Sequence, residues 1–190
     1  LQGVKLRIGK VLNNYQKIKY NQILNFETKQ KSLKSNSIIF PYPKIFKKIK
    51  KGSKILVDDG KFLFKVISKK KNTLVAVCKS QNCIIKNNKS IHIPNIEISF
   101  DRLKAKDKND IKITVKLVCN WIALSYIQND KLIHEAKKLI KKDIGIISKI
   151  ENKHALKNIT KIINATDAIM IARGDLAIDI GHSEVPKVQL

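Results

Sequence analysis

The sequence predicts a mixed α/β fold whose two halves follow different patterns. Residues 4–99 alternate short apolar segments with polar turns, which is typical of antiparallel sheets. Residues 106–172 alternate apolar segments of strand length with segments of helical period, which is typical of a parallel sheet covered by helices. Of the 190 residues 43% are hydrophobic, so the chain can form a core although 28% of its residues are charged.

In the first half, the pattern predicts strands at 54–57, 62–67 and 73–78. Asp58, Asp59 and Gly60 separate the first two strands and are typical of a hairpin turn. Basic side chains occupy alternate positions of these strands, so one face is expected to be solvated. Several short strands at this spacing indicate a small all-β barrel.

In the second half, the period changes and helices and strands take turns. The apolar positions predict, in chain order, a helix at 106–118, a strand at 121–124, a helix at 130–142, a strand at 145–150, a helix at 155–163 and a strand at 168–172. Asp130 is placed to favour the N-terminus of the second helix. The spacing of the strands resembles the repeat of a TIM barrel, and a doubly wound open sheet is the alternative that three repeats leave open.

The composition bears on partners and compartment. The formal charge is +24, but the lysines are spread through every segment together with much Ile and Asn, which indicates a codon bias more than a basic patch. Aromatic residues are not interleaved with the charges as in single-strand binders, so nucleic acid is not the expected partner. Three cysteines and the lack of a signal-peptide pattern favour the reducing cytoplasm, and no apolar run reaches the roughly 18 residues that a membrane span needs.

Polar residues lie at the C-terminal ends of the three predicted parallel strands. They are Ser125, the pair Lys149 and Glu151, and the expected turn 173–175. Because the carboxyl ends of parallel strands meet at one edge, these groups are expected to face one site. Lys149 and Glu151 are two residues apart and project to the same side of an extended strand, and Glu151 with Asp175 would suit a hard divalent cation. The alternative is that the carboxylates only cap helices while Lys149 is solvated.

The motifs around these residues resemble those of the pyruvate kinase family. The resemblance begins with KIEN at 149–152 and IMIARGDLAIDIG at 169–181. It continues upstream, in the family's order, through LQGVKLRIGK at 1–10, ILVDDGK at 55–61, NKSIHIPN at 88–95, KDKNDIK at 106–112 and IALSYIQ at 122–128. Essentially the whole chain is covered.

The resemblance implies phosphoryl transfer from phosphoenolpyruvate to ADP, giving pyruvate and ATP in glycolysis. By position, Lys149 would be the catalytic lysine, Glu151 and Asp175 the ligands of Mg²⁺ or Mn²⁺, and Gly174 with Asp175 the group that binds the substrate carboxylate. Arg7 and Lys89 would contact the nucleotide. Lys5 stands where the family carries Lys in enzymes that need no potassium ion, so K⁺ is not expected to be required.

The resemblance also implies a domain organisation. Residues 1–3 would end a barrel strand, residues 4–101 would form an inserted β-barrel lid, and residues 102–190 would form part of a (β/α)8 barrel. The chain is therefore expected to be a fragment, inactive by itself, of a cytoplasmic enzyme that forms a homotetramer. The competing hypotheses are an inactive remnant of such a gene and, less favoured, a basic nucleic-acid-binding module.

Overall fold

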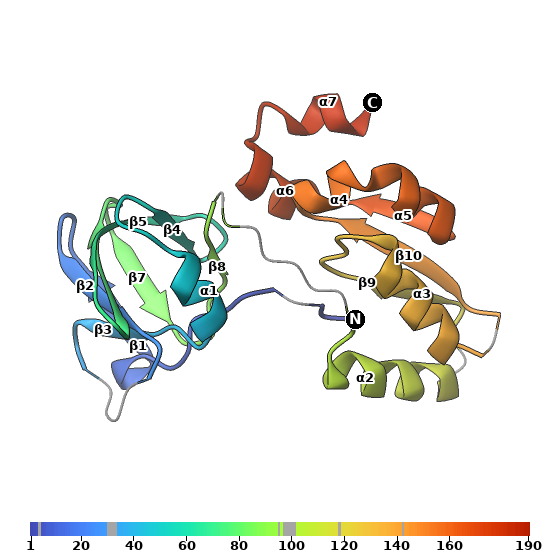
Figure 1. Cartoon of the computed structure of the whole chain (residues 1–190), viewed down its shortest axis with the longest axis horizontal. Coiled ribbons are helices and arrows are strands. Elements are labelled where there is room, and N and C mark those ends of the chain that lie inside the picture. The colour runs from blue at the N-terminus through green and yellow to red at the C-terminus, as the bar shows by residue number, and fades with distance from the viewer. Residues whose placement is uncertain (4, 30–33, 95, 97–101, 118, 142) are drawn as a thin grey trace. The chain divides into compact units, whose positions relative to one another are not determined.

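The fold is mixed α/β and divides into two compact units. A computed structural model describes residues 1–190 except 4, 30–33, 95, 97–101, 118 and 142 (Figure 1). Residues Leu6–Ile98 form one unit, here called the strand-rich unit, and Leu1–Lys5 with Ser99–Leu190 form the other, here called the α/β unit. Positions 4 and 101, which bound the expected lid, lie outside the described residues.

The strand-rich unit contains a six-stranded and a two-stranded sheet (Figure 1). The larger sheet has the order β3-β2-β6-β5-β4-β8; only β2 and β3 pair in parallel. The smaller sheet pairs β1 with β7 antiparallel. The strands are β1 (Tyr15–Ile18), β2 (Ile23–Glu27), β3 (Ser37–Ile39), β4 (Lys54–Val57), β5 (Phe62–Lys69), β6 (Thr73–Cys78), β7 (Cys83–Lys86) and β8 (Ile91–His92), and a 3₁₀ turn, η1, spans Leu12–Asn14.

The three strands predicted in this region are confirmed as β4, β5 and β6, with β5 reaching Lys69 instead of residue 67. Their alternate side chains are buried in a common core, where the rings of Phe26 and Phe64 meet edge to face with centroids 5.5 Å apart. Period-2 alternation thus located the strands because each buries one face.

The interpretation of this region as purely β is corrected by one helix, α1 (Pro43–Lys48). Pro43 opens the helix, where its fixed φ fits and its missing N–H is not needed. At the other end, the ammonium of Lys69 donates to the carbonyls of Phe46, Lys47 and Ile49 at 2.8–2.9 Å. A cation on the exposed carbonyls of a helix C-terminus stabilises so short a helix.

The α/β unit contains a three-stranded parallel sheet in the order β11-β10-β9. Its strands are β9 (Trp121–Leu124), β10 (Gly145–Ile150) and β11 (Ala168–Ile171), and its helices are α2 (Ala105–Lys116), α3 (Asp130–Leu139), α4 (Lys153–Lys157), α5 (Ile159–Ala165), α6 (Arg173–Ile180) and α7 (Val185–Gln189). Helix α3 packs against both α2 and α5. A core of buried Ile, Leu and Ala side chains joins these helices to the sheet.

The predicted strands are confirmed, whereas the predicted helices need correction at their ends. The helix expected over 155–163 is two helices, because Asn158 leaves the helical conformation (φ −110°, ψ 19°) and its side chain donates to the carbonyls of Gln128 and His154. Helix α3 ends at Leu139, since Ile140 is already extended. Val118, the expected end of the first helix, lies outside the described residues.

Within the part of the chain that the structure describes, every helix is too short or too polar to cross a membrane.

Candidate active site

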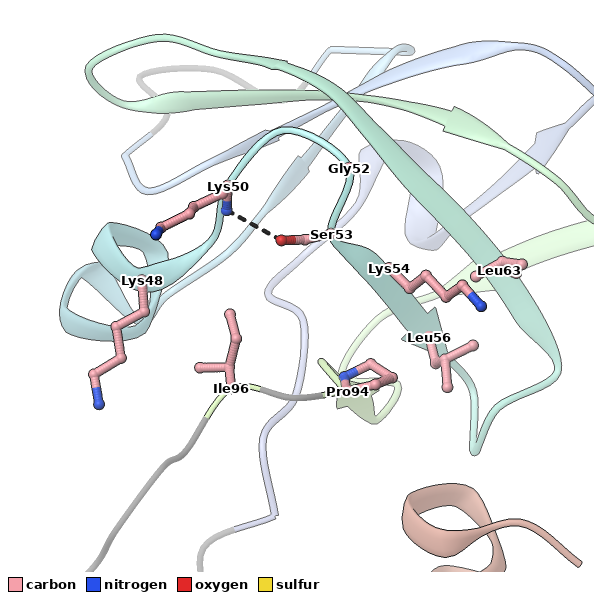
Figure 2. A pocket seen from close by; sticks show the side chains of 9 residues that line it. All are labelled: Lys48, Lys50, Gly52, Ser53, Lys54, Leu56, Leu63, Pro94 and Ile96. Carbon is pink, nitrogen blue, oxygen red and sulfur yellow. Dashed lines mark hydrogen bonds between the residues drawn. The ribbon is translucent and has the colours of Figure 1, made fainter.

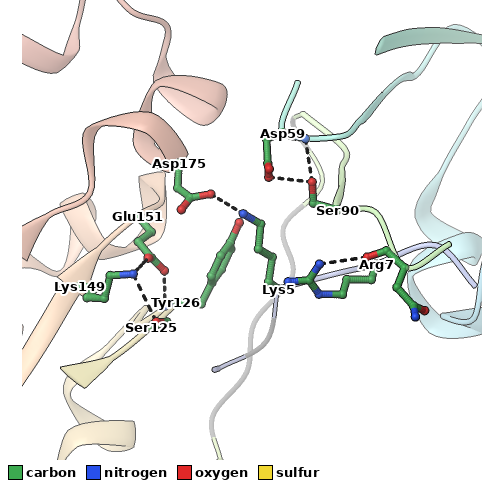
Figure 3. Close-up of polar contacts among 10 residues, drawn as sticks. Lys5, Arg7, Asp59, Ser90, Ser125, Tyr126, Lys149, Glu151 and Asp175 are labelled. Atoms are coloured by element: carbon green, nitrogen blue, oxygen red, sulfur yellow. Dashed lines mark hydrogen bonds and ion pairs between the residues drawn. The ribbon is translucent and has the colours of Figure 1, made fainter. Parts of the chain in front are cut away.

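The end of β10 carries an ion pair whose carboxylate is buried. The Nζ of Lys149, the penultimate residue of the strand, lies 2.5 Å from Oε1 of Glu151. The Lys149 side chain is 24% exposed and that of Glu151 only 2%. The spacing predicted that the two side chains would project to the same side, and this contact confirms it (Figure 3). A buried carboxylate needs such a partner because desolvation would otherwise disfavour its charge.

The loop that follows β9 contributes to the same cluster. The backbone N–H of Tyr126 donates to Oε2 of Glu151 at 2.6 Å, so both carboxylate oxygens are engaged. The hydroxyl of Ser125 lies 3.4 Å from Nζ of Lys149. Ser125 and the Lys149–Glu151 pair are therefore brought together. The role of the Tyr126 amide could not be predicted from the sequence.

Asp175 lies in the first turn of α6, next to the C-terminal end of β11. The turn expected over 173–175 is thus helical, because the backbone of Ala172 already accepts from the N–H of Leu176 at 3.0 Å. A side chain at Gly174 would meet no atom within 4 Å, so the surface beside this residue is open. A carboxylate in the first turn of a helix is favoured by the helix dipole, which explains its local placement.

Lys5 reaches the second carboxylate. Its Nζ lies 2.7 Å from Oδ1 of Asp175, and the two side chains are 20% and 25% exposed. Figure 3 shows the ring of Tyr126 between this pair and the Lys149–Glu151 pair. The resemblance implied separate roles for the two residues, Lys5 in place of a potassium ion and Asp175 as a metal ligand. Their direct contact was not predicted.

Arg7 and Lys89, the expected nucleotide residues, belong to the strand-rich unit. The backbone of Arg7 forms an isolated antiparallel β-bridge with Ser90. The Nη1 of Arg7 donates to the carbonyl of Asn88 at 3.0 Å. Lys89 pairs with Asp58, whose Oδ1 lies 2.8 Å from its Nζ. The structure therefore places the two basic residues on neighbouring segments and gives each a polar partner.

The chemistry of Glu151 and Asp175 fits a hard divalent cation. Each carboxylate contacts an ammonium, and an oxygen atom with several lone pairs can accept a further partner. Mg²⁺ is commonly held by one or two protein carboxylates, with water and substrate oxygens in the other positions. The described residues contain no cluster of three or more His, Cys, Asp or Glu side chains that could hold a metal ion.

A separate hollow of about 730 Å³ lies on the strand-rich unit beside β4 (Figure 2). Lys48, Lys50 and Lys54 line it together with apolar side chains such as Leu56 and Ile96. Figure 2 shows that the three amines point in different directions. A small anion would therefore meet no convergent set of donors in this hollow.

Together, the fold and the site define a mixed α/β protein with a cluster of lysines and carboxylates at the ends of parallel strands. The family model described as the pyruvate kinase barrel domain matches residues 1–190. The chain belongs to the pyruvate kinase family.

Individual relatives agree with this assignment. A pyruvate kinase of Agrobacterium vitis is 31% identical over 191 residues, which cover 100% of this chain and 39% of that protein. That of Clostridium perfringens is 31% identical over 195 residues, covering 100% of this chain and 41% of that protein. The pyruvate kinase of Borreliella burgdorferi is 35% identical over 153 residues, which cover 78% of this chain and 32% of that protein. The chain thus spans about two fifths or less of the length of these relatives.

Proposed function

We propose that this chain forms part of an active site that transfers a phosphoryl group from phosphoenolpyruvate to ADP. The observation that carries the proposal is the pairing of Lys149 with Glu151 at the end of β10, on the same unit as the Lys5–Asp175 pair. Phosphoryl transfer depends chiefly on positioning and on neutralising charge, and such a cluster supplies both. Membership in the pyruvate kinase family supports this reaction over other phosphoryl transfers.

In this proposal, Lys149 is the catalytic cation. Its ammonium stabilises the negative charge of the transferring phosphoryl group and of the enolate that remains on the substrate. The contacts of Lys149 with Glu151 and Ser125 hold the amine at the strand end before substrate arrives. Such preorganisation avoids the cost of ordering a long side chain during the reaction.

Glu151 and Asp175 are proposed to hold Mg²⁺ or Mn²⁺. When bound, the cation would supply positive charge against the phosphoryl oxygens. The open surface beside Gly174 would admit the carboxylate of phosphoenolpyruvate to the backbone N–H groups of Gly174 and Asp175. The burial of Glu151 and its bond to the Tyr126 amide support a fixed ligand at this position.

The strand-rich unit is proposed to serve the nucleotide. Arg7 and Lys89 would contact the phosphates of ADP, and residues 4–101 would act as a β-barrel lid that excludes water. Residues 1–3 would then end a strand of a (β/α)8 barrel to which residues 102–190 contribute. The sequential order of β9, β10 and β11, with α3 packed against both α2 and α5, favours this barrel over a doubly wound sheet.

Three further properties follow for the whole enzyme. Lys5 would replace the charge of a bound monovalent cation, so turnover would not require K⁺. The enzyme would form a homotetramer and work in the cytoplasm. The 190-residue chain alone is expected to be inactive, since it spans about two fifths of its relatives.

A chimera tests the proposal. The matching segment of the Clostridium perfringens pyruvate kinase is replaced by this chain, and pyruvate formation is measured with a lactate dehydrogenase coupled assay, with and without K⁺. We expect activity that Lys149→Met lowers about 10³-fold, since a charge that stabilises the transition state is lost. Lys161→Met, at an exposed position of α5, is the matched control and should leave the rate unchanged.

Each outcome of this assay has a distinct meaning. Equal activity of the chimera and its Lys149→Met variant would refute the site. A folded chimera with no activity would instead support the hypothesis of an inactive remnant. Strong activation by K⁺ would refute the role of Lys5 and leave the role of Lys149 standing.

A further inference from the structure

The loop between β9 and α3, residues 125–129, holds an uncommon backbone conformation at the site. Tyr126 has φ of +57°, a region that residues with a side chain seldom adopt. In this conformation its N–H points to Oε2 of Glu151 at 2.6 Å. Backbone strain of this kind persists only where surrounding contacts hold it in place.

Asn152 supplies such a contact from the residue directly after Glu151. Its Nδ2 donates to the carbonyl of Ile127 at 3.0 Å, and both residues are buried. Its Oδ1 accepts from the N–H of Ala155 at 2.9 Å and so caps α4. One side chain thus joins the β9–α3 loop to the start of α4.

A second tether lies one residue further along the loop. Nδ2 of Asn158 donates to the carbonyl of Gln128 at 2.9 Å and also to that of His154 at 3.1 Å. This tether is shared between two acceptors and is more distant in sequence from Tyr126. Asn152 is therefore the tether with the larger influence on the Tyr126 amide.

We propose that Asn152 is a positioning residue: by holding the carbonyl of Ile127, it keeps the Tyr126 amide on Glu151 and so fixes this carboxylate for a divalent cation. The positioning stands on the geometry of the α/β unit, and its consequence for a cation rests on the proposed function. Groups that orient metal ligands commonly change metal affinity 10- to 100-fold when they are removed.

Asn152→Ser separates the two roles of this side chain. Serine caps helices as well as asparagine does, so α4 keeps its cap, but its short hydroxyl cannot reach the Ile127 carbonyl. The resonance of the Tyr126 amide in the ¹⁵N-labelled 190-residue chain reports on the bond to Glu151. In the parent chain, Glu151→Gln is expected to shift this proton upfield, because a charged acceptor is replaced by a neutral one.

In the Asn152→Ser chain, the Tyr126 proton is expected to move upfield already, and Glu151→Gln should then shift it much less. An unchanged Tyr126 resonance with an unchanged response to Glu151→Gln would overturn the proposal. Asn158→Ala provides a second test that leaves Asn152 in place, with a smaller shift in the same direction. If Asn152→Ser does not fold, Asn152→Asp, which also caps α4 but has no donor for the Ile127 carbonyl, tests the same bond, and an unmoved Tyr126 resonance in that variant would overturn the proposal.

Binding of Mn²⁺, measured by electron paramagnetic resonance, tests the consequence for the cation. We expect Asn152→Ser to weaken Mn²⁺ binding about tenfold relative to the parent chain. Equal affinities would overturn the role of Asn152 toward the cation. If neither chain binds Mn²⁺ while the Tyr126 resonance responds as expected, the positioning stands and the proposed cation site fails.

Discussion

Strands β10 and β11 are parallel neighbours, yet they present their carboxylates in different ways. β10 pairs on both sides, with β9 and with β11, and its alternate residues Ile146, Ser148 and Ile150 are almost completely buried. β11 lies at the edge of the described sheet, and its residues Ile169 and Met170 are 41% and 45% exposed.

The carboxylates that follow the two strands differ in the same way, one buried and the other partly exposed. Glu151 directly follows the central strand and is held by Lys149 and by the Tyr126 amide at 2% exposure. Asp175 follows the edge strand through the first turn of α6 and pairs with Lys5 at 25% exposure. One carboxylate is thus held beside the buried central strand, whereas the other lies in the first turn of α6, which packs against α4 and α7. The comparison predicts that equivalent changes on the two sides have unequal effects.

The largest difference is expected between Glu151→Ala and Asp175→Ala. Removing Glu151 takes away the carboxylate that pairs with Lys149 and accepts from the Tyr126 N–H, so we expect a loss of about 3 kcal/mol in the free energy of unfolding. Removing Asp175 breaks a partly exposed pair and should cost about 1 kcal/mol or less. Urea unfolding followed by the fluorescence of Trp121, the only tryptophan of the sequence, measures both in the unit that contains them. Equal losses of unfolding free energy in Glu151→Ala and Asp175→Ala would contradict the distinction between the buried and the partly exposed carboxylate.

A second comparison concerns the strands themselves. Ile150→Ala creates a cavity beneath β10 and is expected to cost about 3 kcal/mol. Met170→Ala on β11 removes a side chain that is already half exposed and should change stability by less than about 0.5 kcal/mol. The same fluorescence measurement applies. A large loss from Met170→Ala would mean that β11 is covered in solution, for example by another copy of the chain.

The smallest effect is expected from Asp167, which precedes β11 and holds the start of β10. Its Oδ2 accepts from the N–H of Ile146 at 2.8 Å, and this bond, followed by the ammonium of Lys137, lowers the pKa of the Asp167 carboxyl. A carboxyl with a lowered pKa in the folded state stabilises the fold above its unfolded pKa of about 3.9, and this contribution is lost as the pH falls through the folded pKa.

Because the Asp167 side chain is 41% exposed, its contribution should be below about 1 kcal/mol. Asp167→Asn is expected to destabilise the protein near pH 6 and to have a smaller effect near pH 2, where the parent carboxyl carries less of its charge. Urea titrations at the two pH values check this. If Asp167→Asn destabilises the protein equally at both pH values, the effect comes from altered packing or hydrogen bonding and not from the lost charge.

Six of the strands were predictable from the sequence because each buries one face or both: the alternation located β4, β5 and β6, and the apolar runs located β9, β10 and β11. Strands β1, β2, β3, β7 and β8 were not predicted. Helix ends were less predictable, since Asn158 interrupts a continuous apolar pattern by bonding to the Gln128 carbonyl in another segment. The short α1 was missed for a similar reason, as its C-terminal partner, Lys69, lies in a distant strand.

The site was predictable only where it is local in sequence. The spacing of Lys149 and Glu151 was enough to predict that they project to the same side, but their direct ion pair was not predicted. The contact of Lys5 with Asp175 joins residues far apart in the chain, and no periodicity contains it. The Tyr126 amide was also missed, because a backbone N–H has no signature in the residue type and its left-handed conformation is more usual for Gly or Asn.

The central claim is that Glu151 and Asp175 together hold one divalent cation beside Lys149. Titration of the 190-residue chain with Mn²⁺, followed by electron paramagnetic resonance, tests it in the parent chain and in Glu151→Gln and Asp175→Asn. We predict one site in the parent chain and at least tenfold weaker binding in each variant, with the larger loss for Glu151→Gln because that ligand is fixed in advance. Equal Mn²⁺ affinities in the parent chain and both variants would contradict the account.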